Sequence, residues 1–133
     1  MIIRAYRPED RETLERIHAE QAFTYPFPNL EDPTFFLKMV IEDDDGKVIQ
    51  AIVLHLTAEA YFLGDKKAGS PQSRFDAFVR LHDECARLAY YPGGLSDIHA
   101  FLPPEVEKSF GRRLLKLGWV TEPWKPFVKF LKG

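Results

Sequence analysis

Cysteine is nearly absent from this sequence, since Cys85 is the only one among 133 residues. A lone cysteine excludes an intrachain disulfide and is typical of proteins kept in a reducing compartment. Long apolar runs are also missing, because the most apolar stretch, Ala51–Leu63, is interrupted by His55 and Glu59 and is too short to span a bilayer. The apolar start of the chain reaches Arg4 before a secretory signal can develop. We therefore expect a soluble, cytoplasmic protein.

An excess of positive charge is lacking as well, because 18 Lys and Arg face 20 Asp and Glu, for a formal net charge of −2. Nucleic-acid binding needs a cationic face that neutralises phosphates, so we expect no nucleic-acid partner and no membrane partner. With 45% hydrophobic and 29% charged residues, the composition is that of a globular chain. The length predicts a single domain, residues 1–133, with a buried core.

The pattern of apolar residues predicts an α/β fold. Strands are predicted at Ile2–Tyr6, Phe35–Ile41, Val48–Leu56, Glu59–Leu63, Ile98–Leu102, Trp119–Val120 and Phe127–Leu131. Glu59–Leu63 is either a second, shorter strand or an extension of the strand before it. Asp45-Gly46 predicts a hairpin turn. Helices are predicted to begin near Pro8, Pro71 and Pro104, because proline presets the φ angle of a first helical turn.

The helices carry apolar stripes, and an aromatic loop follows the first of them. The stripe of the second helix, Pro71–Ala89, comprises Phe75, Phe78, Val79, His82, Cys85 and Ala89. A crossover of this length predicts that Glu59–Leu63 and Ile98–Leu102 run parallel and splay apart. The stripe of the third comprises Val106, Phe110, Leu114 and Leu117, and Gly118 is its C-terminal stop. The loop Phe23–Pro28 is not helical, because its prolines favour extended geometry, and its aromatic side chains serve either a pocket or core packing.

This order of elements resembles the GNAT superfamily of N-acetyltransferases over nearly the whole chain. Ile3–Asp10 looks like the first strand and helix start of those enzymes, and Phe110–Trp119 is similar to their last helix and its Leu-Gly-Phe ending. The resemblance implies a mixed, mostly antiparallel central sheet with a splayed parallel strand pair, flanked by helices. It also implies acetyl-CoA as acyl donor and an amine of a small molecule or peptide as acceptor. A homodimer is compatible with the sequence, which leaves the oligomeric state open.

In this family a short loop at a helix N-terminus binds the pyrophosphate of CoA through backbone N–H groups. The matching residues here are Lys66, Lys67, Gly69 and Ser70, while Pro71 stands where the family has a residue with an N–H. The helix dipole and free N–H groups at such a site favour an anion. The alternative is that Gly69-Ser70-Pro71 only begins and caps the helix.

The first candidate for the proton acceptor that the resemblance requires is Glu59, and His99 and His55 are the other two. Their alternative roles are a solvated strand residue for Glu59 and hydrogen-bonded core residues for the histidines. Leu114 occupies the position at which many family members have a tyrosine that protonates the thiolate. Two functions therefore remain open, an active N-acyltransferase and a catalytically degenerate module that binds a ligand or a protein. His82 and Cys85 lack clustered partners, so we expect no metal site.

Overall fold

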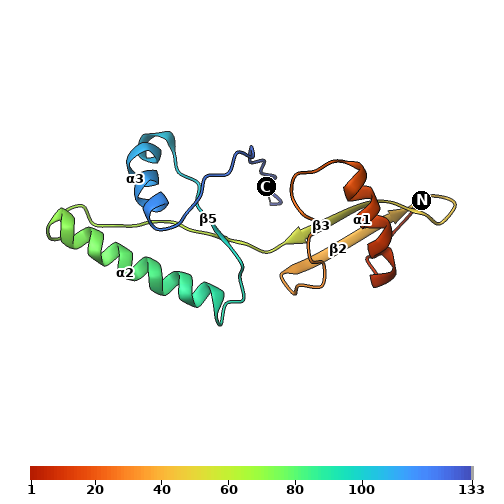
Figure 1. Cartoon of the computed structure of the whole chain (residues 1–133), viewed down its shortest axis with the longest axis horizontal. Coiled ribbons are helices and arrows are strands. Elements are labelled where there is room, and N and C mark those ends of the chain that lie inside the picture. Colours follow the sequence, from red (N-terminus) through yellow and green to blue (C-terminus); the bar gives the residue numbers. More distant parts are fainter. Residues whose placement is uncertain (133) are drawn as a thin grey trace. The chain divides into compact units, whose positions relative to one another are not determined.

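The computed structural model describes residues 1–132, which form two compact units. The first unit comprises Met1–Ala60 and Glu84–His99, and the second comprises Tyr61–Asp83 and the chain from Ala100 onward. The elements in chain order (Figure 1) are β1 (Ile2–Ala5), the 3-10 helix η1 (Pro8–Asp10), α1 (Arg11–Glu20), β2 (Phe35–Glu42), β3 (Val48–His55), β4 (Ala58–Glu59), α2 (Pro71–Tyr90), β5 (Ile98–His99) and α3 (Pro104–Lys116). This mixture of strands and helices confirms the predicted α/β class.

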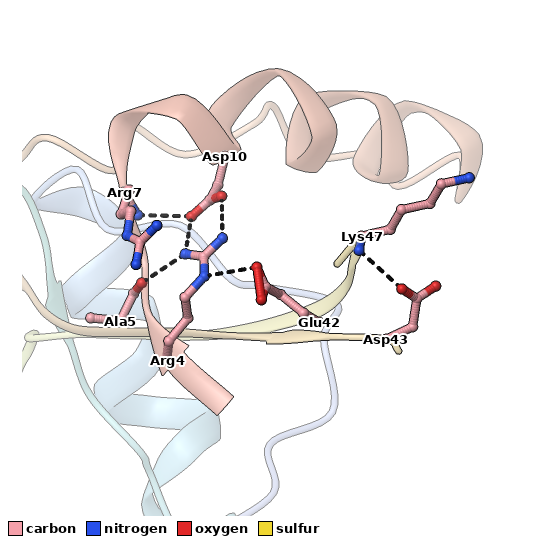
Figure 2. A network of polar contacts seen from close by, with 7 residues as sticks. All are labelled: Arg4, Ala5, Arg7, Asp10, Glu42, Asp43 and Lys47. Carbon is pink, nitrogen blue, oxygen red and sulfur yellow. Dashed lines mark hydrogen bonds and ion pairs between the residues drawn. The ribbon is translucent and has the colours of Figure 1, made fainter. Parts of the chain in front are cut away.

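The first unit contains a three-stranded antiparallel sheet with β2 in the middle, between β1 and β3. The hairpin predicted from Asp45-Gly46 joins β2 to β3, and Gly46 adopts a φ of +79°, which an L side chain rarely adopts. The carboxylate of Asp43 accepts hydrogen bonds from the backbone N–H groups of Asp45 and Lys47, each at 2.9 Å. Figure 2 shows the bond to Lys47. These bonds close the turn, so the acidic tip of the hairpin has a local structural role.

An ion pair fixes the start of the first helix to the sheet (Figure 2). The guanidinium of Arg4 on β1 donates two hydrogen bonds of 2.8 Å to the carboxylate of Asp10. Its Nε donates a third to Glu42 on β2, at 3.2 Å. Asp10 is only 7% exposed and also accepts the backbone N–H of Arg7 at 2.8 Å. The hydrogen bonds from Arg4 lower the pKa of Asp10 below its ordinary value, so both partners stay charged at neutral pH.

The core of the first unit lies between α1, the loop that follows it and β2. Its buried residues are Leu14, Leu30 and Val40. The partly buried side chains around them are Tyr6, Ile17, Phe27, Phe35, Val48 and Val53. Leu14 and Ile17 are three residues apart on α1 and both pack in this core, so they mark the inner face of the helix. The aromatic loop Phe23–Pro28 folds back over His18 of α1, whose ring lies 5.2 Å from that of Tyr25.

A second, two-stranded sheet in the same unit consists of β4 and β5, which run parallel. Parallel pairing is therefore confirmed, and β4 is a separate short strand. The predicted lengths, Glu59–Leu63 and Ile98–Leu102, are wrong, because pairing ends with the bond from Ala60 N–H to the carbonyl of His99. Beyond it the chain enters the second unit, where Phe62 packs against Phe110 with ring centroids 4.9 Å apart.

Aromatic rings dominate the interior of the second unit. Phe62, Phe78, Phe110 and Trp119 form one cluster with centroid separations between 4.9 and 6.1 Å. The predicted stripe of α2 is wrong at one position, since Cys85 is exposed. At 100° per residue Ala86 lies nearer the middle of the stripe than Cys85 does, and Ala86 is partly buried.

The end of α3 is a Schellman motif. Gly118 adopts a φ of +95°, and the N–H of Trp119 donates to the carbonyl of Leu114 at 3.1 Å. The strands predicted at Trp119–Val120 and Phe127–Leu131 are wrong, because residues 119–132 form neither helix nor strand. The prolines within this segment lack an N–H for a β-ladder, and Phe127 is 91% exposed. None of the helices between residues 1 and 132 combines the length and the apolar character that a membrane span requires.

Candidate functional site

The parallel pair of the first unit brings two of the predicted proton acceptors together. Glu59 on β4 and His99 on β5 are direct partners in the register. Partners in a parallel ladder project from the same face of the sheet, so the carboxylate and the imidazole share one side of this pair. Glu59 is exposed and makes no hydrogen bond or ion pair within residues 1–132. Its carboxylate is therefore open to a cationic group that approaches from solvent.

Asp97, which the sequence prediction did not include, contacts the imidazole of His99. One carboxylate oxygen of Asp97 lies 3.2 Å from Nε2 of His99, and the other accepts the hydroxyl of Thr57 at 3.4 Å. An ionised carboxylate only accepts hydrogen bonds, so Nε2 carries the proton in this contact, and in the neutral ring Nδ1 keeps its lone pair. A carboxylate that orients an imidazole is an arrangement suited to a base, and the imidazole remains 32% exposed. Asp97 and His99 are two residues apart, a spacing that puts both on one face of an extended segment.

The predicted pyrophosphate loop lies in the second unit, directly before α2. Ser70 and Ser73 cap this helix reciprocally, since each hydroxyl accepts the backbone N–H of the other residue, at 3.1 and 3.0 Å. Arg74 donates to the carbonyls of Ala68 and Gly69, at 3.2 and 2.9 Å. The cap that was the alternative interpretation of this segment is therefore present, and it occupies the N–H of Ser70.

The same loop still has the charge that an anion requires. Within residues 1–132, the donors of this loop for which no internal partner is found include the N–H groups of Lys66, Gly69 and Gln72 and the ammonium groups of Lys66 and Lys67. Both lysines are exposed at the positive end of a 20-residue helix. Gly69 has a φ of +62°, and a Cβ there would lie 2.5 Å from Oγ of Ser73. The two ammonium groups match the charge of a pyrophosphate, and the backbone at position 69 requires glycine. Pro71 contributes no N–H.

The other candidate groups have structural partners. The ring of His55 stacks on Phe35 with centroids 4.5 Å apart, which is a packing role. Nε2 of His82 accepts the indole N–H of Trp119 at 2.8 Å. Leu114, at the position of the family tyrosine, is 5% exposed and belongs to the core. No three His, Cys, Asp or Glu side chains in the described part of the chain gather as a metal site requires.

The candidate groups thus form two sets. Glu59, Asp97 and His99 belong to the first unit, and Lys66–Ser70 belongs to the second. The first set contains groups that are able to accept a proton, and the second contains cationic groups and N–H donors that are able to attract an anion. Compared with known proteins, the chain matches no family model, no curated protein and no solved structure.

Proposed function

We propose that this protein is an acyl-CoA-dependent N-acyltransferase of the GNAT type, which transfers an acetyl group from acetyl-CoA to an amine of a small molecule or peptide. The observation that carries the proposal is the short parallel pair β4–β5, whose register sets Glu59 beside His99. The helix that connects the two strands begins at a basic, glycine-containing loop. A proton acceptor and an anion-binding loop are the two functional parts that such a transfer needs.

The role of the first set is to remove a proton from the acceptor. An amine is an ammonium ion at neutral pH and attacks only after it loses a proton. Nδ1 of His99 takes that proton, and the positive charge that develops on the imidazole is stabilised by the carboxylate of Asp97. Glu59 attracts the incoming ammonium from the opposite strand. His99 is thus the proposed catalytic base, and Asp97 is a positioning residue.

The role of the second set is to hold the donor. Acetyl-CoA supplies the acyl group as a thioester, whose sulfur leaves as a thiolate. Lys66, Lys67, the N–H of Gly69 and the hydroxyl of Ser70 would hold its pyrophosphate. The chain offers no tyrosine for the thiolate at position 114, so solvent protonates it.

A second function is favoured by one observation, the burial of Leu114 at 5% exposure. A core leucine donates no proton to a leaving thiolate. This feature suits a module that retains CoA binding and has lost transfer. The two functions differ in one measurable property, which is release of free thiol.

The test is incubation of the full-length protein with acetyl-CoA and a panel of a polyamine, an amino sugar, an aromatic amine and a short peptide. Thiol release that depends on an amine supports transfer. His99→Gln should then lower kcat by a factor of about 10²–10⁴, the usual contribution of a positioned proton acceptor. His55→Gln is the matched control and should release thiol at the parental rate, because the ring of His55 packs on Phe35 and lies outside the β4–β5 pair.

Asp97→Asn separates positioning from a merely structural role. Without the carboxylate the imidazole is no longer oriented, so Asp97→Asn should lower kcat and leave the KM for acetyl-CoA unchanged. A purely structural role would change kcat, KM and the unfolding temperature together. If calorimetry shows CoA binding and no amine of the panel causes release of free thiol from acetyl-CoA, the protein is the non-catalytic module. Absence of CoA binding would defeat both functions.

A further inference from the structure

An irregular segment of the second unit, residues 123–132, exposes a run of apolar side chains (Figure 1). Phe127, Val128, Phe130 and Leu131 are between 75 and 91% exposed, and Trp124 is 54% exposed. Single exposed apolar residues are ordinary, but a concentrated group of them marks a surface that binds a partner. The segment forms neither helix nor strand, so no secondary structure covers these side chains by its own folding.

The same segment is locally basic. It contains Lys125, Lys129 and Lys132 and no Asp or Glu. All three lysines are exposed, and none forms an ion pair within residues 1–132. The net charge of −2, from which we expect no membrane partner, is an average over the whole chain and conceals this concentration of positive charge. A partner that fits the segment therefore combines negative charge with an apolar layer.

The apolar and the basic residues separate when the segment is placed on a helix. Four apolar residues recur at the spacing i, i+3, i+4 and i+7, which puts them on one helix face: Trp124, Phe127, Val128 and Leu131. The three lysines recur at i, i+4 and i+7, and at 100° per residue their side is centred about 115° from the apolar face. In a helix that begins at Trp124, Pro126 falls in the first turn, where the N–H groups have no partner within the helix. A helix this short is not stable alone in water, so the amphipathic face forms only together with its partner.

The choice of lysine favours a lipid surface over a protein groove or a nucleic acid. Protein–protein interfaces are enriched in Arg and depleted in Lys, because the planar guanidinium makes directional paired hydrogen bonds. Lysine has a flexible stem that lies along an apolar boundary while its ammonium group stays in water. A nucleic acid would stack on the aromatic rings but would leave the exposed Val128 and Leu131 without a role.

We infer that residues 124–132 fold on an anionic lipid surface as a short amphipathic helix. Its apolar face lies at the boundary between headgroups and acyl chains, and its three lysines lie among the acidic headgroups. Phe130 is on the flank of the apolar face away from the lysines and adds to the inserted side. Attachment is peripheral, because a span needs about 20 apolar residues. This surface is independent of the proposed acyl transfer, and a chain without transferase activity would still have it.

The test is co-sedimentation of the full-length protein with vesicles of phosphatidylcholine, either pure or with roughly 30% phosphatidylserine. Binding to the anionic vesicles should be at least about 10-fold tighter, because each lysine near a negative surface strengthens binding roughly 5-fold. Far-UV circular dichroism should show a gain of helix on the anionic vesicles only, and high salt should weaken the binding. Equal binding to both kinds of vesicle would overturn the inference. Absence of binding to either would also overturn it and would favour an acidic protein groove.

Two pairs of variants assign the binding to this segment. Phe127→Ser should weaken binding to the anionic vesicles at least about 10-fold, whereas Leu63→Ser, at a position 95% exposed outside the segment, should bind as the parent does. Lys129→Gln should weaken it roughly 5-fold, whereas Lys47→Gln in the β2–β3 turn should change it little. All four side chains are exposed, so the fold should persist, and circular dichroism without vesicles verifies this. Parental affinity in Phe127→Ser would refute the role of the segment.

Discussion

The indole N–H of Trp119 donates a hydrogen bond to Nε2 of His82 at 2.8 Å, across 37 residues of sequence. Indole is only a donor, so Nε2 of His82 is the acceptor and its proton is on Nδ1, 3.0 Å from a carboxylate oxygen of Asp83. This bond ties α2 to the chain directly after α3, beside the aromatic cluster of the second unit.

Removal of this bond should destabilise the protein. His82→Leu keeps an apolar body of similar size but leaves the indole N–H without its acceptor, so the free energy of unfolding should fall by about 1–2 kcal/mol. Urea unfolding followed by far-UV circular dichroism measures the change. In a double-mutant cycle with Trp119→Phe, the two losses should be less than additive. Strict additivity would mean that the bond contributes nothing.

The ion pair of Arg4 and Asp10 predicts a loss of stability in acid. The folded pKa of Asp10 is lowered, chiefly by hydrogen bonds from Arg4, so its contribution is fully present above the unfolded value of about 3.9. It is lost as pH falls through the lower, folded pKa. Asp10→Asn should cost about 1–2 kcal/mol at pH 7 and less in acid. Asp44→Asn is the control, because that carboxylate is 93% exposed and should change little.

A substitution at position 114 tests whether the tyrosine that many family members have there can be restored. Because Leu114 is a buried core residue of α3, Leu114→Tyr should cost about 1–3 kcal/mol and give no increase in thiol release. Leu115→Tyr is the matched control, since Leu115 is 51% exposed and its substitution should be nearly neutral. Thermal unfolding and the thiol assay check both variants. Faster release by a stable Leu114→Tyr protein would show that its side chain reaches the donor.

Gly69 tests the loop proposed to hold CoA. Gly69→Val puts a Cβ 2.5 Å from Oγ of Ser73 at a φ of +62°, so the loop must shift and CoA should bind at least about 10-fold more weakly. Gly64→Val is the control, because a Cβ at Gly64 meets nothing within 4 Å. Calorimetric titration with CoA measures the affinity, and circular dichroism verifies the fold. An unchanged affinity for Gly69→Val would move the site elsewhere.

Much of the fold follows from local sequence signals. The bounds of α2 agree with the predicted helix within a residue, because Pro71 and Ser70 determine its start. The hairpin follows from Asp45-Gly46 in the same way. The errors lie where long-range packing decides. β4 ends at Glu59, and Phe62 packs on Phe110, a contact that no local pattern encodes.

The candidate site was predictable only in part. Glu59 and His99 were identified from the family resemblance, and the register shows that they are neighbours. Asp97 was missed, because a carboxylate before a strand is usually solvated and only its distance to His99 reveals the pairing. Burial of Nε2 of His18 without a hydrogen-bond partner in residues 1–132 could not be predicted either, because it depends on how the aromatic loop folds back.

The sheet order has a consequence for the behaviour of concentrated samples. Within the first unit's sheet β3 is an edge strand, and its eight residues include no charge, no proline and no glycine. Such an edge is a template for strand pairing between molecules, and Ile52 on it is 72% exposed. Aggregation should therefore begin at β3 when the protein is heated or concentrated. Ile52→Lys places a charge on that edge, outside the buried core, and should raise the concentration at which light scattering first appears.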